Sequence, residues 1–125
     1  MASPIQQLNA MRLLSENWDG YGAAAPEGHV VDLAGEFVGL IEALLRKSAA
    51  DAAIVHVSPT RIGGVLIEWA DAATQHEVDI SPDQSFGFLH LNKATGKIVT
   101  CKILPGDQAV VQRAFLRELS QLVAA

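Results

Sequence analysis

Three carboxylates on two neighbouring β-rich segments are the residues best placed for chemistry in this 125-residue sequence. Residues 61–69 and 76–80 alternate in polarity and predict the two strands of a hairpin. In the register that we favour, Glu68 lies directly opposite Glu77, and Asp79 lies diagonally beside them. Like charges so placed repel one another, so a metal ion, a shared proton in acid–base catalysis or a basic partner protein would each stabilise them. The interpretation that we favour for these three residues is a solvated sheet face with Lys97, Lys102 or Arg61 alongside.

The same hairpin register places Trp69 opposite His76. Of the other histidines, His56 lies between two valines and is expected on the solvent face, whereas His90 shares a face with two phenylalanines. We interpret each histidine as a surface or half-buried residue. A joint site of His56, His76 and His90 would require adjacent strands and one common face, and a register slip of one residue would reverse the faces.

The sequence contains none of the motifs that define metal centres or nucleotide-binding loops. No two histidines have metal-ligand spacing, and the single cysteine, Cys101, has no C-x-x-C partner. There is no G-x-S-x-G, Walker or G-x-G-x-x-G motif. Gly63-Gly64 precedes a strand, which indicates a bulge or a strand start that needs close backbone approach. We therefore expect no metal and no cofactor, assign no catalytic residue and favour a non-enzymatic role.

Residues 17–22, N-W-D-G-Y-G, are the most unusual segment, with one of two tryptophans and the only tyrosine. Trp18, Asp19 and Tyr21 could anchor a binding partner. Alternatively, the aromatic rings fold back and pin the loop onto the core, while Asp19 accepts local backbone hydrogen bonds. Pinning is the interpretation that we favour.

Hydrophobic periodicity predicts the elements that must position these residues. Apolar residues at helical spacing predict helices over residues 4–16 and 26–47, and a third helix begins near Asp107. Between them the period changes to two, which predicts five strands over residues 53–58, 61–69, 76–80, 86–91 and 97–104. The order α-α-β-β-β-β-β-α with short connections predicts a single α+β domain over residues 1–125, an antiparallel meander sheet with helices packed on one face.

Composition limits the class of protein and its partners. Half of the residues are hydrophobic and 18% are charged, which excludes intrinsic disorder. The net charge of −5 argues against direct binding to nucleic acid or to an anionic membrane. One cysteine and the lack of a recognisable signal segment predict a cytoplasmic protein. A mean hydropathy of +0.23 and edge strands at 53–58 and 97–104 make a homo-oligomer a candidate assembly.

Two motifs, N-W-D-G-Y-G-A at residues 17–23 and G-G-V-L-I-E-W at residues 63–69, carry a resemblance to a known group. They resemble small uncharacterised bacterial proteins that share N-W-D-G-Y-G-A and a later G-G-V-x-x-E-W strand, over about residues 14–91. The resemblance implies a bacterial cytosolic accessory protein linked to mobile or defence genes, and it carries over no catalytic residue. It singles out for a structural or binding role Asn17, Trp18, Asp19, Gly20, Tyr21, Glu68 and Trp69.

We expect this protein to bind another protein, in the manner of an antitoxin, immunity protein, inhibitor or complex subunit. Glu68, Glu77 and Asp79 on an open sheet face would attract a partner with a basic surface, and added salt would slow that association. The alternative function is that of a small-ligand binder or enzyme, with the ligand held between the 17–22 loop, Trp69 and the sheet carboxylates. Direct nucleic-acid binding is the reading we favour least.

Overall fold

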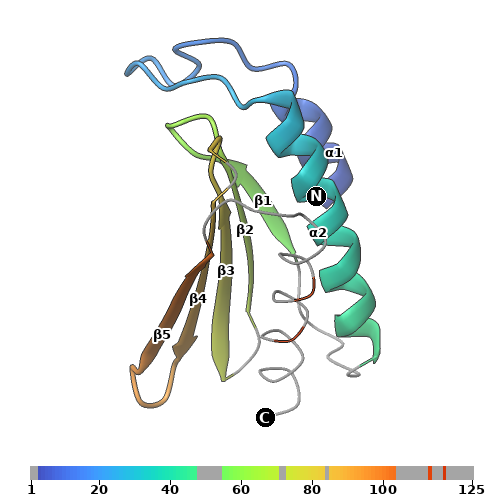
Figure 1. Ribbon diagram of the computed structural model, residues 1–125, viewed down its shortest axis with the longest axis vertical. Helices are drawn as coiled ribbons and strands as arrows, with labels where there is room; N and C mark the ends of the chain where they lie inside the picture. The colour runs from blue at the N-terminus through green and yellow to red at the C-terminus, as the bar shows by residue number, and fades with distance from the viewer. Residues whose placement is uncertain are drawn as a thin grey trace.

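Two helices precede an antiparallel sheet in this computed structural model, which describes residues 3–47, 55–70, 73–83 and 85–103 together with Arg113 and Arg117. The predicted α+β class is confirmed (Figure 1). The helix predicted from Asp107 lies outside the described residues, except for Arg113 and Arg117, which are helical and exposed. The described elements are α1 Pro4–Met11, α2 Gly28–Lys47, β1 His56–Pro59, β2 Val65–Ala70, β3 Thr74–Ile80, β4 Phe86–Asn92 and β5 Ile98–Ile103.

The sheet is a meander in which each strand pairs with the next along the chain. The spatial order is β1-β2-β3-β4-β5, and all four pairings are antiparallel. The predicted β2–β3 register is confirmed, because Glu68 pairs with Glu77 and Trp69 pairs with His76. Side chains of β2 and β3 therefore alternate between two faces in the way that the sequence predicts.

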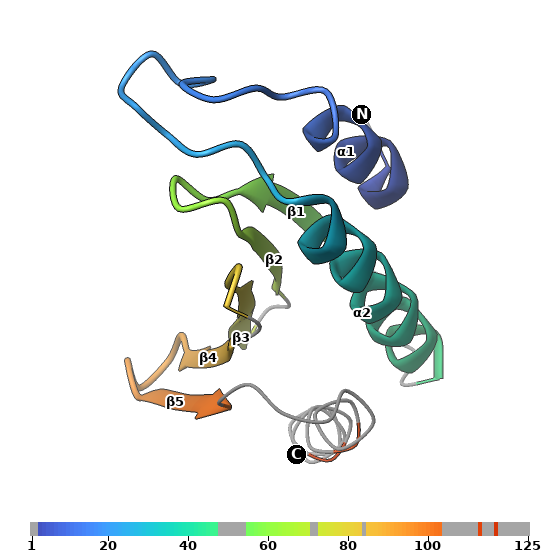
Figure 2. The ribbon, with the colours of Figure 1, turned by 45° about the horizontal axis from the view of Figure 1, so that its top comes forward.

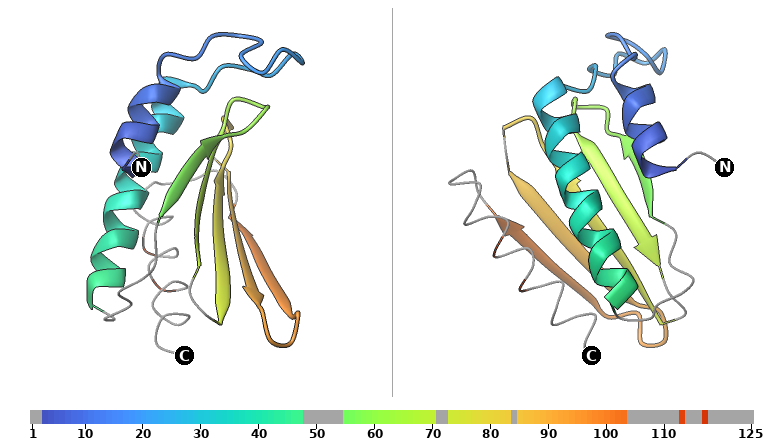
Figure 3. Two further views of the ribbon diagram at one scale, coloured as in Figure 1. Left: turned by 180° about the vertical axis from the view of Figure 1, so that it is seen from behind. Right: turned by 90° about the vertical axis from the view of Figure 1, so that its right-hand side faces the viewer.

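Both helices lie on the same side of the sheet, as Figures 2 and 3 show. The apolar side of α2 and alternate residues of the strands form one buried cluster. Phe37 of α2 meets Phe86 of β4 edge to face, with 5.2 Å between ring centroids. The opposite side of the sheet, which α1 and α2 do not cover, is called the open face below; it carries Leu66, Glu68, Gln75, Glu77, Asp79, Leu89 and Leu91.

Helix α1 is shorter than its periodicity predicts. Ser3 caps its start with a capping box to Gln6, but the helix ends at Met11 and not at residue 16. Leu8 and Met11 of the predicted apolar spacing are buried, but the next member, Leu14, is only half-buried and lies outside the helix. The prediction was wrong because residues 16 and 17 bond to the returning chain: Glu16 accepts from the Ala25 N–H, and the Asn17 N–H donates to the Ala23 carbonyl.

Helix α1 also covers the outer edge of the sheet at β1. The Val57 N–H donates to the Gln7 side-chain oxygen at 2.7 Å, so a backbone donor of this outermost strand bonds to the helix. Edge strands with unpaired donors invite pairing with another chain, and a covering helix prevents it. Pairing of two copies through the predicted edge at 53–58 is therefore blocked at Val57.

Strand β2 begins at Val65, four residues later than predicted, because residues 60–64 form a turn. The Thr60 side chain accepts a hydrogen bond from the Gly64 N–H at 3.0 Å, and Gly63 has a positive φ of 86°. A Cβ at Gly64 would lie 2.3 Å from the Ile80 carbonyl oxygen, so only glycine fits at this strand start. The predicted need for close backbone approach is confirmed at Gly64.

Candidate functional site

The carboxylate of Asp19 organises the 17–22 loop. One oxygen accepts the Tyr21 and Ala23 backbone N–H groups at 2.8 and 3.1 Å, and the other accepts Arg61 Nε at 3.0 Å. These bonds, above all the one from the Tyr21 N–H, hold the pKa of Asp19 below its ordinary value despite opposing desolvation. The carboxylate therefore stays ionised and fixes the loop as a compact turn.

Asn17 and Trp18 close the same loop from its other end. Asn17 adopts a positive φ of 62°, and its side-chain oxygen accepts the Gly22 N–H at 2.7 Å. The half-buried Trp18 donates its indole N–H to the Ala24 carbonyl at 2.8 Å. The favoured interpretation, in which the aromatic rings fold back and Asp19 accepts local backbone hydrogen bonds, is thus confirmed for Trp18 and Asp19. It was wrong for Tyr21, whose ring is exposed.

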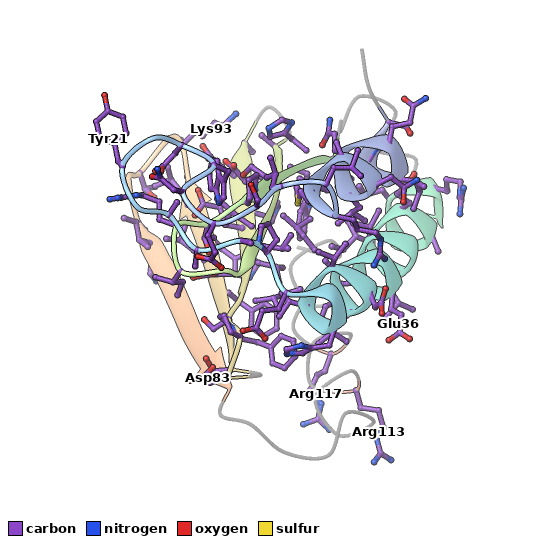
Figure 4. The ribbon with its side chains drawn as sticks, turned by 90° about the horizontal axis from the view of Figure 1, so that it is seen from above. Tyr21, Glu36, Asp83, Lys93, Arg113 and Arg117 are labelled. Atoms are coloured by element: carbon purple, nitrogen blue, oxygen red, sulfur yellow. The ribbon has the colours of Figure 1, made fainter. Side chains whose placement is uncertain are left out.

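The two sequence motifs meet in space. Arg61, in the turn before β2, donates to the Tyr21 carbonyl as well as to Asp19, and the Ala24 N–H donates to the Arg61 carbonyl. Ala24 and Ile62 form a parallel bridge between the two segments. Tyr21 itself is 83% exposed, and its ring points away from the rest of the molecule (Figure 4).

The open face carries the predicted carboxylates in the predicted arrangement. Glu68 and Glu77 are half-buried neighbours in direct register. His56 is exposed, as predicted, and the structure pairs it with Glu68 from β1. Asp79 is exposed and pairs with Leu66. Glu77 accepts a side-chain hydrogen bond from Gln75 at 3.3 Å. Within the described ranges, neither Glu68 nor Glu77 forms a salt bridge, so the carboxylate pair lacks a cation there.

Half-buried leucines surround this carboxylate pair. Leu66 precedes Glu68 by one position on its face, and Leu89 pairs with Glu77 from β4. Leu91 lies at the next position along the same face of β4. The open face therefore combines, within the described ranges, two carboxylates that form no salt bridge with half-buried apolar side chains.

His76 and His90 are buried on the helix-facing side, so their expected surface or half-buried placement was wrong. They are 3% and 7% exposed, and their Nδ1 atoms lie 2.7 Å apart across β3 and β4. Trp69 stacks on His76 with ring centroids 5.1 Å apart, and Thr74 Oγ1 lies 2.9 Å from His76 Nε2. A sequence signal existed: His76 has the same parity along β3 as the buried Val78.

The hydrogen bond between the two histidines needs one protonated and one unprotonated Nδ1. Burial, followed by the charge of a protonated His76, lowers the pKa of His90 to about 4. His90 therefore stays uncharged near neutral pH. His56 lies on the other face of the sheet, so no site of three histidines forms.

The structure separates the residues of the predicted small-ligand site. Trp69 lies near the end of β2 that is remote from the 60–64 turn, and it is 3% exposed on the helix-facing side. The 17–22 loop is bonded to that turn, at the other end of the strand. The part of the chain that the structure describes holds no group of three or more histidine, cysteine or acidic residues that could bind a metal ion.

Comparison with known proteins gives no independent assignment. This chain has no significant match among protein-family models, curated proteins or solved structures. Among the described residues, no helix has the length and apolar character needed to cross a membrane.

Proposed function

We propose that this protein is a non-enzymatic accessory protein that binds another protein through the open face of its sheet. The observation that carries the proposal is the Glu68–Glu77 pair, two carboxylates in direct register with no salt bridge within the described ranges. The partner presents a basic surface. The motifs at 17–23 and 63–69 support a bacterial, cytoplasmic setting linked to mobile or defence genes, through the resemblance that they carry.

An arginine side chain fits this pair best. Residues directly opposite on antiparallel strands have Cβ atoms about 4.5–5.5 Å apart, so two carboxylates at such a distance repel each other. A guanidinium has planar, forked donors that can bond both carboxylates at once, which a lysine ammonium does less well. The aliphatic stem of the same arginine would pack on Leu66 and Leu89, which lie next to the two glutamates on this face.

Binding of this kind depends on ionic strength. Complementary charge accelerates encounter, and salt screens it with a Debye length of about 10 Å at 0.1 M. An uncharged ligand site would lack this dependence. The salt response therefore separates a basic protein partner from an uncharged small ligand.

The test is a pull-down with the tagged protein from its host lysate at low and moderate salt, followed by affinity measurement on the purified partner. The variant E68Q/E77Q removes the paired charges with little change of shape. The matched control, E36Q/E42Q, removes the same number of charges from α2. We expect E68Q/E77Q to weaken binding by roughly tenfold or more, with a smaller salt dependence, and E36Q/E42Q to leave both nearly unchanged. Equal affinity of the two double variants would refute the proposal.

A further inference from the structure

The 17–22 loop holds one aromatic ring away from all the contacts that build the loop. Asp19 and Arg61 fix the backbone of Tyr21 at its N–H and its carbonyl, and Asn17 fixes the next residue, Gly22. Among the described residues, the Tyr21 side chain has no hydrogen bond and no ring contact, and it is 83% exposed. These hydrogen bonds therefore fix the backbone of the loop, and the Tyr21 ring takes no part in them.

The neighbouring aromatic residue behaves in the opposite way. Trp18 is half buried and its indole donates to the Ala24 carbonyl, so its contacts explain its place in the loop. Within the part of the chain that the structure describes, no comparable contact explains the place of the Tyr21 ring. A rigidly presented tyrosine provides large contact area with little loss of conformational entropy on binding, which is why tyrosine is frequent at binding hot spots.

The position of the loop connects Tyr21 to the open face. Figures 1 and 3 show that the chain between α1 and α2 crosses the end of the sheet, from the helix side to the open side. In Figure 4 the Tyr21 ring points outward on the side remote from the helices. Tyr21 therefore lies beyond the end of the face that holds Glu68 and Glu77.

We propose that Tyr21 is a second contact point for the same partner and packs against an apolar side chain of an extended segment whose arginine pairs with Glu68 and Glu77. This inference rests on the proposed function. An apolar group is favoured at Tyr21 because the two charged side chains bonded to its backbone, Asp19 and Arg61, already form an ion pair with each other. The exposed ring gains from burial against an apolar side chain.

The strand geometry gives the spacing between the two contact points. Tyr21 is bonded to the turn that ends at Gly64, and Glu68 lies four residues further along β2. Four residues of a β-strand span about 13 Å, so an extended partner segment needs roughly four to six residues between its apolar side chain and its arginine. This spacing is a property that an unrelated basic peptide does not share.

The test uses a phage-displayed library of random twelve-residue peptides, selected on the full-length protein. We expect enriched peptides with an arginine and an apolar residue roughly four to six positions apart. For synthetic copies of these peptides, Y21A should weaken binding by roughly tenfold, whereas Y21F should retain it because the apolar ring remains. L13A is the matched control, since Leu13 is equally exposed at 86% but lies outside the pinned loop.

The possible results separate this inference from the proposed function. Peptides that bind Y21A as tightly as the unchanged protein, but lose affinity for E68Q/E77Q, overturn the role of Tyr21 and leave the proposed function intact. Peptides indifferent to both variants, or a selection with no enrichment, overturn the role of Tyr21 and count against the proposed function as well. Circular dichroism melting of Y21A checks that the fold is unchanged.

Discussion

Asp19 in the 17–22 loop and His90 on the covered face of the sheet both have a lowered pKa, with opposite electrical consequences. Hydrogen bonds from backbone N–H groups and from Arg61 stabilise the charged form of Asp19. Burial, with the charge of His76, disfavours the charged form of His90. The ionised carboxylate of Asp19 therefore holds the loop together, whereas a proton added to His90 destabilises the row of Trp69, His76 and His90.

Because their charges act in opposite ways, the two regions should lose their structure under different conditions. The two tryptophans of the chain allow each region to be observed separately, since Trp18 belongs to the loop and Trp69 stacks on His76. A W69F variant reports on the loop alone, and a W18F variant reports on the histidine row alone.

The substitution G64A should have the largest effect on stability. It pushes the 60–64 turn, which anchors the 17–22 loop, away from strand β3. The new Cβ would lie 2.3 Å from the Ile80 carbonyl and 2.9 Å from Thr60 Oγ1, and backbone atoms must move to accommodate it. We expect a loss of about 3 kcal/mol in the free energy of unfolding, measured by urea denaturation. The control is G39A in α2, where a Cβ meets nothing within 4 Å and should stabilise by about 0.5–1 kcal/mol.

Acid should destabilise the histidine row next. The pKa of His90 is about 4 in the folded protein and about 6.5 when unfolded, so the unfolded state binds a proton first as the pH falls. Stability from this residue is complete above pH 6.5 and is lost progressively down to pH 4, by about 2–3 kcal/mol. The check is the urea midpoint against pH in W18F, in which Trp69 fluorescence reports on the row.

The variant H90Q supplies the control for this acid effect. Its side-chain amide can still bond His76 Nδ1 but does not titrate in this range. We expect a flatter stability profile between pH 6.5 and 4 than in the unchanged protein. An equally steep profile in H90Q would assign the acid sensitivity to other groups.

Several of these features could be predicted from the sequence because they follow from local rules. The β2–β3 register followed from polarity alternation in two short strands with a short connection, and it placed Glu68 opposite Glu77 correctly. The pinning of the loop followed from the turn preferences of Asp-Gly and from the partner that a buried indole requires. Both inferences needed only near neighbours in the chain.

The predictions failed where a distant segment decided the outcome. The end of α1 at Met11 is set by Glu16 and Asn17, which bond to residues of the returning chain. The parity of His76 and His90 along their strands indicated the covered face, but their direct hydrogen bond needs two strands to bring the imidazoles together. The bond between Arg61 and Asp19 joins segments 42 positions apart, which no local pattern indicates.

Asp19 should fail in a lower pH window than the histidine row. For an acid with a lowered pKa, stability is present above the ordinary pKa near 3.8 and is lost as the pH falls through the folded-state value. The loop should therefore stay intact while His90 titrates. In W69F, Trp18 fluorescence should remain constant from pH 6.5 to 4 and change only below that range. A change of Trp18 at the same pH as Trp69 would show that the two regions unfold together.

The variant Y21A should have the smallest effect on stability. Asp19 and Trp18 hold the loop through hydrogen bonds, whereas the Tyr21 ring is 83% exposed and only its backbone is bonded. We expect Y21A to change the free energy of unfolding by less than about 0.5 kcal/mol, as for other exposed sites. The D19A variant should instead accelerate hydrogen exchange at the Tyr21 and Ala23 N–H groups, because both lose their acceptor. If Y21A accelerated hydrogen exchange in the loop as much as D19A does, the Tyr21 ring would support the loop. The reason to assign Tyr21 to a partner would then be removed.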